Sequence, residues 1–450
     1  MKLYSQSTEK IKDINPKELN IAIYGLGKMG LPLATVFANK GFRVIGVDIN
    51  EKIVTKINKG INPIVGEEGL DQLLKKVVKR HCLWATTDGI FASKTSDIKI
   101  IIVPVLVDDR SDPDLSILLD VTKTIAKGLN KGDIVILEST VPPGTTMELM
   151  GKTLEKISGL RLNEDFGLAH CPERISSGTA ITDIEGRLCP KIVGGSDMKT
   201  ASIANFLYRK INKLGVIIVQ NPYVAELVKI WGEIYRDVNI AFANNLYLVC
   251  KEFGVDALEV IKASNTNPHS KILMPGPGVG GHCIPVYPYF VLQNTKLNQT
   301  LLKEARRIND SMPQHVIDLT LDALLEKGVP LEKTTVLVLG LSYREGIKEI
   351  RQSPGVTVTQ KLKKYMKRVF VYDPLFSKKE ISDFGLEYKK GFSNIDCVII
   401  TTAESEFKNL DWKKISRKMR TKIVIDTRNI VNNKELINLG FTIRRIGYVK

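Results

Sequence analysis

Residues 20–48 read NIAIYGLGKMGLPLATVFANKGFRVIGVD, and the order of features in this stretch decides the fold. The apolar residues 20–24 predict a short buried strand, and the glycine-rich turn 25–30 follows directly. Apolar residues at helical spacing over 31–40 predict a helix, and 42–47 predict a second strand that ends on an acid. Strand, glycine turn, helix, strand and acid in this order are typical of a dinucleotide-binding βαβ unit.

The three glycines of this turn have separate roles. Gly25 allows the tight turn, Gly27 lets a pyrophosphate approach the helix N-terminus, and Gly30 lets helix and strand pack closely. Asp48 would accept hydrogen bonds from ribose hydroxyls and would repel a 2′-phosphate. We therefore expect NAD as the cofactor, with Met29 of the same turn beside it.

Length and composition limit the class of protein. The chain has 450 residues, of which 43% are hydrophobic and 25% charged, as in globular proteins of two or three domains. The sequence has no apolar run of membrane-spanning length and a polar N-terminus, so we expect a cytoplasmic protein with no membrane partner. Because its six cysteines include no C-x-x-C pair, we expect reduced thiols and no metal site. The net charge of +16 permits nucleic-acid binding, but the basic residues are scattered along the chain. This distribution favours an anionic small molecule as the binding partner, and we expect no nucleic-acid partner.

The alternation of strands and helices continues along the chain. Apolar runs at 98–103 and 134–137 predict parallel strands, and ligands sit at the carboxyl ends of such strands. Thr140 follows the second run, where it would touch a ligand or only close its own turn. Residues 222–253 predict one helix of some thirty residues, suited to joining two domains and to contacting a second subunit. Strands and helices from 334 onward indicate a second doubly wound domain that lacks the full glycine fingerprint.

A second glycine-rich stretch, PGPGVGGHCIP at 275–285, contains Cys283 near its end. Its four glycines and three prolines predict a loop that can approach a ligand closely. A lone cysteine is more often a small buried apolar residue than a nucleophile. A cysteine at the end of such a loop differs, because backbone N–H groups of the loop can face an anionic oxygen. The loop alone leaves both interpretations open.

The chain resembles the UDP-glucose/GDP-mannose dehydrogenase family over nearly its whole length. The resemblance is carried by GLGKMGLPL at 25–33, ESTVPPGTT at 138–146, PERI at 172–175, KIVGG at 191–195, RDVNIAFAN at 236–244, the loop 275–285 and DTR at 426–428. The GGHC form of the loop is similar to that of members that oxidise UDP-N-acetylhexosamines, UDP-N-acetyl-D-mannosamine above all. The resemblance implies NAD-dependent oxidation of such a sugar at C6 to the uronate, through a thiohemiacetal and a thioester on Cys283.

The resemblance also implies roles for single residues. Lys229 would hold positive charge beside a developing oxyanion, and Glu173 would position or activate water. Thr140 would lie near the nicotinamide, and Arg351 would reach the cofactor from the second lobe. The positions that match substrate contacts are Arg174, Ile175, Lys229, Arg236, His269, Gly280, Tyr343, Arg344 and Arg428.

The sequence departs from the family pattern at positions of the site. Glu233 stands where asparagine is usual, four residues after Lys229, and Tyr287 stands where aspartate is usual, four residues after Cys283. His269 replaces an arginine that reaches a neighbouring subunit's substrate. We hypothesise that Glu233 takes over the electrostatic role of the missing aspartate as a catalytic residue. The alternatives are a UDP-N-acetylglucosamine or UDP-glucose dehydrogenase, a weakened member that only binds NAD and nucleotide sugar, a simple hydroxyacid dehydrogenase, and a nucleic-acid-binding protein.

These observations together predict an α/β protein with two doubly wound Rossmann-like domains, joined by a long central helix and a helical central domain. The NAD-binding domain would span 1–212, and the central helical and dimerisation domain, which carries Lys229 and Cys283, would span 213–328. A UDP-sugar-binding domain would span 329–450. A homodimer or a higher homo-oligomer is the expected assembly.

Overall fold

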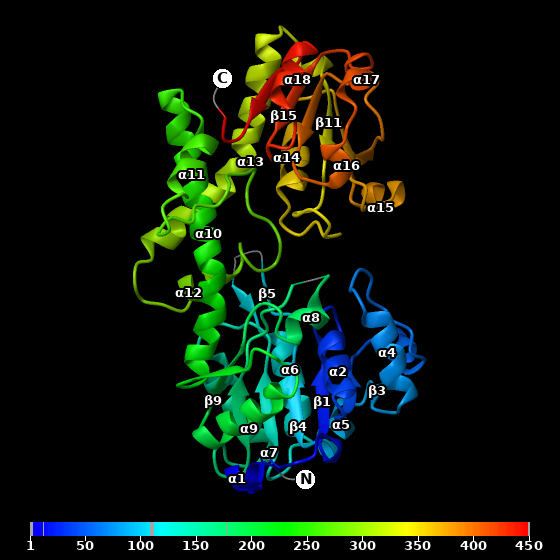
Figure 1. Ribbon diagram of the computed structural model, residues 1–450, viewed down its shortest axis with the longest axis vertical. Helices are drawn as coiled ribbons and strands as arrows, with labels where there is room; N and C mark the ends of the chain where they lie inside the picture. The colour runs from blue at the N-terminus through cyan, green and yellow to red at the C-terminus, as the bar shows by residue number, and fades with distance from the viewer. Residues whose placement is uncertain (1–2, 12, 109–111, 177, 449–450) are drawn as a thin grey trace. The chain divides into compact units, whose positions relative to one another are not determined.

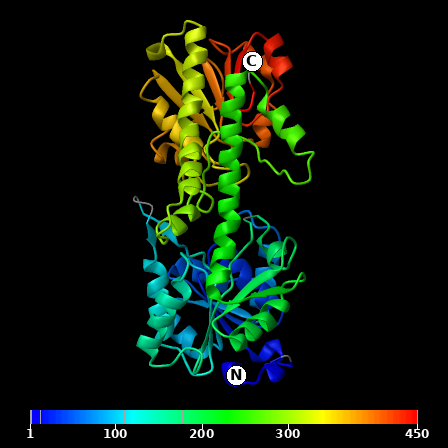
Figure 2. The same ribbon diagram turned by 90° about the vertical axis from the view of Figure 1, so that its left-hand side faces the viewer.

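The computed structural model describes residues 3–11, 13–108, 112–176 and 178–448. The chain divides into two compact units, the first of Met1–Gly232 with Tyr289–Thr295 and the second of Glu233–Pro288 with Lys296–Lys450. The division falls within helix α10 (Pro222–Phe253), which Figure 2 shows as one continuous green ribbon. Its 32 residues confirm the long helix that the apolar periodicity predicts.

The first unit is built on an eight-stranded sheet with the strand order β10-β9-β8-β7-β4-β1-β2-β3 (Figure 1). Neighbouring strands are parallel except β8 and β9, which are antiparallel. The strands are β1 (Asn20–Tyr24), β2 (Arg43–Val47), β3 (Leu83–Thr86), β4 (Ile98–Ile101), β7 (Ile134–Leu137), β8 (Gly167–His170), β9 (Lys191–Gly195) and β10 (Val216–Val219). A separate antiparallel pair, β5 (Leu106–Val107) and β6 (Pro113–Asp114), lies outside this sheet.

Helices cover both faces of this sheet. Ile21 and Ile23 of β1 point into one apolar core, and Ala22 and Tyr24 point into the other, as the alternation of a strand requires. The helices are α2 (Gly30–Asn39), α3 (Glu51–Asn58), α4 (Leu70–Lys79), α5 (Gly89–Thr95), α6 (Ser116–Ala126), α7 (Lys152–Ser158), α8 (Ala180–Ile184) and α9 (Met198–Arg209), with the π-helical turn η3 (Thr145–Gly151). The two buried faces explain why the central strands β1, β4 and β7 are largely apolar.

The βαβ unit at the N-terminus has the geometry that its sequence predicts. Strands β1 and β2 pair in parallel, and Gly25 between β1 and α2 has φ +96°, a left-handed conformation that favours glycine. A Cβ atom on Gly30 would overlap the carbonyl oxygen of Gly25, so only glycine fits there. Asp48, at the end of β2, accepts a hydrogen bond from the Leu26 N–H across 3.0 Å. The carboxylate therefore holds the glycine turn against the second strand.

The second unit contains a six-stranded parallel sheet with the order β13-β12-β11-β14-β15-β16. Val336 and Val338 point into one core and Leu337 and Leu339 into the other, so this sheet is also covered on both faces. Its strands are β11 (Thr335–Leu339), β12 (Arg368–Tyr372), β13 (Glu387–Tyr388), β14 (Cys397–Ile400), β15 (Ile423–Asp426) and β16 (Thr442–Arg445). Its further helices are α11 (Ala257–Ser264), α13 (Thr300–Glu326), α14 (Pro354–Leu362), α15 (Lys378–Asp383), α16 (Ser405–Lys408), α17 (Trp412–Ser416) and α18 (Asn433–Asn438).

The second sheet repeats the glycine geometry of the first with a longer connection. Gly340 follows β11 with φ +109°, and a Cβ atom on Gly355 of α14 would lie 2.5 Å from the Gly340 carbonyl oxygen. Asp373, after β12, accepts a hydrogen bond from the Leu341 N–H across 2.7 Å. The residues 341–353 stand between the turn and the helix. A contiguous fingerprint is therefore absent from the sequence, although its backbone contacts are present.

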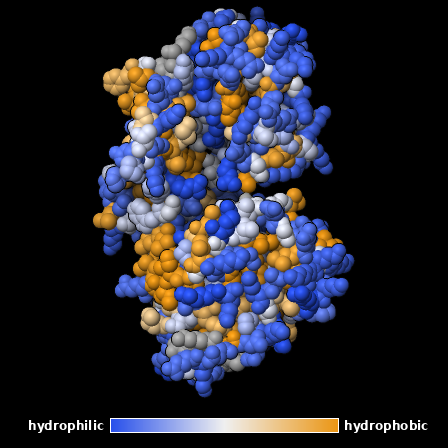
Figure 3. All heavy atoms as spheres, in the orientation of Figure 1, coloured by the Kyte–Doolittle hydropathy of each residue, from blue (hydrophilic) through white to orange (hydrophobic). Residues whose placement is uncertain are grey.

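The mostly parallel first sheet and the parallel second sheet, with their helices and the long helix α10, confirm the predicted fold class. Hydrophilic residues cover much of the visible face of each unit in Figure 3, with separate hydrophobic patches between them. Within the part of the chain that the structure describes, no helix has both the length and the apolar character needed to cross a membrane.

Candidate functional site

The glycine turn of the first unit leaves space for a ligand. Around the position of a Cβ on Gly27 no atom lies within 4 Å, whereas Gly25 and Gly30 are closely packed. Met29 is half-buried immediately before α2. Asp48 is also half-buried at the end of β2, and its second oxygen accepts the Asn50 N–H across 2.9 Å. An open turn at a helix N-terminus with a carboxylate beside it fits the pyrophosphate and ribose of a dinucleotide.

The polar segment after β7 is tied into the first unit by side chains. The Ser139 hydroxyl donates to the Val103 carbonyl across 2.7 Å and accepts the Val103 N–H across 2.9 Å, which joins the ends of β7 and β4. Thr140, the next residue, is half-buried. The Ser139 hydroxyl therefore has a structural role. Thr140 lies at the carboxyl end of β7, where ligands of parallel sheets bind.

Glu226 of α10, which the sequence did not single out, holds the following turn. Its buried carboxylate accepts hydrogen bonds from the Gly144 N–H at 2.6 Å, the Thr146 N–H at 2.8 Å and the Thr146 hydroxyl at 2.5 Å. Burial raises the pKa of Glu226, and these donors oppose the shift. The carboxylate links α10 to η3, and Lys229 follows it by one helical turn.

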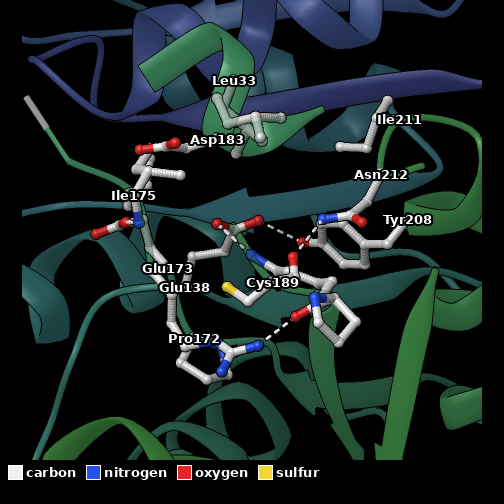
Figure 4. A pocket seen from close by; sticks show the side chains of 15 residues that line it. Leu33, Glu138, Pro172, Glu173, Ile175, Asp183, Cys189, Tyr208, Ile211 and Asn212 are labelled. Carbon is white, nitrogen blue, oxygen red and sulfur yellow. Dashed lines mark hydrogen bonds and ion pairs between the residues drawn. The ribbon is translucent and has the colours of Figure 1, made fainter. Parts of the chain in front are cut away.

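A pocket lies in the first unit (Figure 4). At its centre the Glu138 carboxylate forms an ion pair with Lys191 across 2.8 Å and accepts a hydrogen bond from the Tyr208 hydroxyl. The Lys191 ammonium also lies 4.6 Å from the centre of the Tyr208 ring. The lining residues are Leu33, Ile102, Glu138, Pro172, Glu173, Arg174, Ile175, Asp183, Ile184, Cys189, Pro190, Lys191, Tyr208, Ile211 and Asn212.

Three predicted site residues, Glu173, Arg174 and Ile175, line this pocket after β8. Burial raises the pKa of Glu173, and the positive charge of Lys229 is the largest effect that opposes this shift. The Glu173 carboxylate accepts a hydrogen bond from the Ile175 N–H, and the Arg174 guanidinium donates to the Pro190 carbonyl. Lys229 is itself buried. A half-buried carboxylate with a raised pKa is suited to exchange a proton with water.

The Cys283 loop belongs to the second unit and lies against the residues after β11. The Gly281 N–H donates to the Arg351 carbonyl across 2.9 Å, and the Gly276 N–H donates to the Asn244 side-chain oxygen across 2.9 Å. A Cβ atom on Gly280 would lie 2.7 Å from the Cβ of Tyr343. The close approach explains why the predicted residue Gly280 is a glycine.

Cys283 is half-buried and lies among polar side chains. The Tyr287 hydroxyl donates a hydrogen bond to the Cys283 sulfur across 3.4 Å. His282 Nδ1 lies 3.3 Å from the Glu349 carboxylate. The pKa of His282 is raised, chiefly by hydrogen bonding to the Cys283 thiol. The pKa of Tyr343 is raised mainly by burial, and the charge of Cys283 adds to this shift.

The predicted arginines of the second unit have different surroundings. Arg428 donates from Nε to the Thr401 carbonyl across 2.8 Å, its Nη1 approaches Gly276 of the loop, and burial lowers its pKa to about 10. Arg236 is exposed and pairs with Glu233 across 3.2 Å. Arg344, Arg351 and His269 are exposed as well.

The structure therefore distributes the predicted residues over both units. The first unit holds Gly25, Gly27, Met29, Gly30, Asp48, Thr140, Glu173, Arg174, Ile175 and Lys229, and the second holds Glu233, Arg236, His269, Gly280, Cys283, Tyr343, Arg344, Arg351 and Arg428.

Three domain models of one family match the chain. The NAD binding domain of the UDP-glucose/GDP-mannose dehydrogenase family matches residues 19–212, its central domain matches 223–311, and its UDP binding domain matches 337–433. The chain belongs to the UDP-glucose/GDP-mannose dehydrogenase family. Membership confirms the predicted NAD cofactor and makes the protein an NAD-dependent UDP-sugar dehydrogenase with a nucleotide-sugar substrate. The predicted domain boundaries at 212 and 328 stay predictions.

Relatives within the dehydrogenase family cover almost the whole chain. A protein of Pyrococcus horikoshii named UDP-N-acetyl-D-mannosamine dehydrogenase is 39% identical over 429 residues, which are 95% of this chain and 99% of the relative. A Ralstonia nicotianae NDP-N-acetyl-D-galactosaminuronic acid dehydrogenase is 34% identical over 92% of this chain and 97% of its own. The solved structure of a UDP-D-ManNAc dehydrogenase from Pyrococcus horikoshii superimposes with a TM-score of 0.87 at 37% identity, over 95% of this chain and 99% of that one.

Proposed function

We propose that this dehydrogenase oxidises UDP-N-acetyl-D-mannosamine at C6 to the uronate and uses two NAD per sugar. The observation that carries the substrate assignment is the 39% identity to the Pyrococcus horikoshii protein of that name over nearly both whole chains. The GGHC form of the loop at 280–283 supports the same class of sugar. NAD supplies the hydride acceptor in each of the two oxidations.

Cys283 is the proposed nucleophile. The first oxidation gives an aldehyde, and the Cys283 thiolate adds to its carbon to form a thiohemiacetal. The second oxidation gives a thioester, which water hydrolyses to release the uronate and restore the thiol. The covalent bond keeps the aldehyde in place between the two oxidations. The half-buried position of Cys283 on a loop of closely packed glycines supports this role.

Lys229, Glu173 and Glu233 are the other proposed catalytic residues. Lys229 stabilises the oxyanion that forms when sulfur or water adds to the carbonyl carbon. Glu173, whose pKa is raised by burial and lowered by Lys229, takes a proton from the attacking water. Glu233 carries the negative charge that the usual aspartate would supply, and its carboxylate pairs with Arg236 across 3.2 Å.

NAD and the nucleotide sugar are proposed to bind at the two Rossmann-like sheets. Gly25, Gly27, Met29, Gly30, Asp48, Thr140 and Arg351 would bind NAD. The nucleotide sugar would contact Arg174, Ile175, Lys229, Arg236, His269, Gly280, Tyr343, Arg344 and Arg428. Arginines suit this ligand because their planar guanidinium groups can form paired hydrogen bonds with a diphosphate.

A homodimer formed through α10 is the proposed assembly. Tyr235, Phe242 and Val249 recur every seven residues on this helix, and their side chains are 57%, 55% and 45% exposed. A row of exposed apolar side chains at this spacing favours packing against a second helix. His269, which is exposed, would reach the second subunit. The cytoplasm is the proposed location, since the six cysteines are free thiols.

The function is tested by the ratio of NADH to uronate with UDP-N-acetyl-D-mannosamine, UDP-N-acetylglucosamine and UDP-glucose. We expect two NADH per uronate and the highest kcat/KM with the first sugar. One NADH per sugar would indicate a simple oxidation, and no NADH with any of the three would indicate a member that only binds its ligands. A higher kcat/KM with another sugar of the panel would replace the assigned substrate.

A further inference from the structure

Tyr287 is placed against the proposed nucleophile by the local backbone. The Val286 and Tyr287 N–H groups donate to the Cys283 carbonyl across 3.1 and 3.0 Å, at the start of helix α12 (Tyr287–Leu292). Residues 283 and 287 are therefore one helical turn apart on one side of the chain. The Tyr287 ring is buried, which holds its hydroxyl at 3.4 Å from the Cys283 sulfur.

His282 directly precedes Cys283 in the chain, and its neighbours raise the pKa of its imidazole. Hydrogen bonding to Cys283 raises the pKa of His282 most, burial opposes the shift, and the charges of Cys283 and Glu349 add to it. Arg351 lowers the pKa. The Glu349 carboxylate lies 3.3 Å from Nδ1 of the ring. An imidazole beside a carboxylate, in the residue next to the thiol, is suited to accept the thiol proton.

We propose that Tyr287 is a further catalytic residue, which together with His282 holds Cys283 as the thiolate that attacks the aldehyde. The inference rests on the proposed function, because the aldehyde carbon is the target of the sulfur. The S–H bond breaks, and its proton passes to the His282 ring beside Glu349. The sulfur lone pair forms the C–S bond, and the carbonyl π pair moves to the oxygen. Tyr287 keeps its proton and donates a hydrogen bond to the sulfur.

The residue type at position 287 agrees with this role. An aspartate, which the family usually has there, would place a negative charge beside the sulfur and disfavour the thiolate. A phenol is neutral at pH 7 and donates a hydrogen bond, which favours the thiolate. Burial also raises the pKa of Tyr343, and the charge of Cys283 raises it further, so this phenol stays neutral. At position 287 the sulfur thus has a hydrogen-bond donor, where the family usually has a carboxylate.

The test measures how fast iodoacetamide alkylates Cys283 as a function of pH, in the full-length protein without NAD or nucleotide sugar. Peptide mass spectrometry distinguishes Cys283 from the other five cysteines. Tyr287→Phe keeps the buried ring and removes the donor, so the midpoint of the pH profile should rise by about one pH unit. His282→Gln should raise it as well. Tyr289→Phe, a half-buried tyrosine two residues away, is the matched control and should leave the midpoint unchanged.

An unchanged midpoint in Tyr287→Phe would overturn the proposal. If that variant does not fold, NMR of 13C-tyrosine in the wild type decides instead: the Tyr287 ring resonance should shift with the same pH midpoint as alkylation, and a resonance that does not shift would overturn the proposal. Because the assay contains no substrate, it separates the two inferences. A shifted midpoint in an enzyme that forms no uronate contradicts only the proposed function, whereas an unshifted midpoint in an enzyme that forms uronate contradicts only the role of Tyr287.

Discussion

Replacement of Glu226 by glutamine tests whether this buried carboxylate fixes the turn between Thr140 and η3. The carboxylate accepts three hydrogen bonds, one on Oε2 from Gly144 and two on Oε1 from Thr146. The amide of glutamine keeps one oxygen, which can retain both bonds to Thr146. Its NH₂ group then faces the Gly144 N–H, so one charge-assisted bond is lost and one buried donor is left without an acceptor.

The expected cost follows from these contacts. A hydrogen bond to a charged group contributes about 1.5–3 kcal/mol, and a buried unsatisfied donor costs about 1–3 kcal/mol. Since the neutral amide is easier to bury than the carboxylate, we expect a net loss of about 2–4 kcal/mol in the stability of this turn. A loss of this size corresponds to a roughly 30- to 1,000-fold increase in local opening.

Hydrogen exchange of peptides that cover residues 142–147 measures this opening. The Gly144 and Thr146 amides should exchange faster in Glu226→Gln by the factor given. Tyr223→Phe is the control, because it removes an exposed 2.8 Å hydrogen bond to Glu148 in the same turn and should change exchange little. Equal protection of the two amides in the wild type and Glu226→Gln would refute the reasoning.

Two further predictions concern the glycine turn and acid stability. Gly30→Ala should lower the thermal midpoint and abolish NAD binding, since its Cβ would overlap the Gly25 carbonyl oxygen, whereas Gly27→Ala should keep the midpoint and weaken NAD binding in calorimetry. Wild-type NAD affinity in Gly30→Ala would contradict this assignment. Burial lowers the pKa of His315 to about 4 from its usual 6.5, so the unfolded chain binds this proton more readily and stability is lost as the pH falls from 6.5 to 4. In urea unfolding, the free energy of unfolding of His315→Gln should fall by up to about 3 kcal/mol less than that of the wild type between pH 6.5 and 4. The same pH dependence of this free energy in both proteins would contradict the prediction.

The sequence predicted the elements whose signals are local. Strand β1, the glycine turn, α2 and Asp48 are contiguous, and their roles depend on backbone conformation and apolar spacing within 29 residues. The long apolar pattern of α10 is equally local. The second Rossmann-like sheet was recognised only in outline, because residues 341–354 separate Gly340 from Gly355. Their close approach in the fold could not be read from the spacing of the two glycines.

The site was predicted in part, because some of its contacts join distant segments. Glu226 lies 80 residues from Thr146, which it binds, and nothing in either segment alone indicates the pair. The Glu138–Lys191–Tyr208 cluster is of the same kind. Tyr287 could be noticed as an unusual residue four positions after Cys283, but the direction of its hydrogen bond required coordinates. Local sequence thus predicts the nucleophile, and the fold shows which side chains contact it.

The most direct measurement is the uronate formed by Cys283→Ser from UDP-N-acetyl-D-mannosamine and NAD, beside the wild type. A covalent role for the sulfur predicts two NADH and one uronate per sugar in the wild type, and no detectable uronate in the serine variant with NAD binding retained. Uronate production by the variant at the wild-type rate would contradict the claim that the sulfur bonds to the substrate.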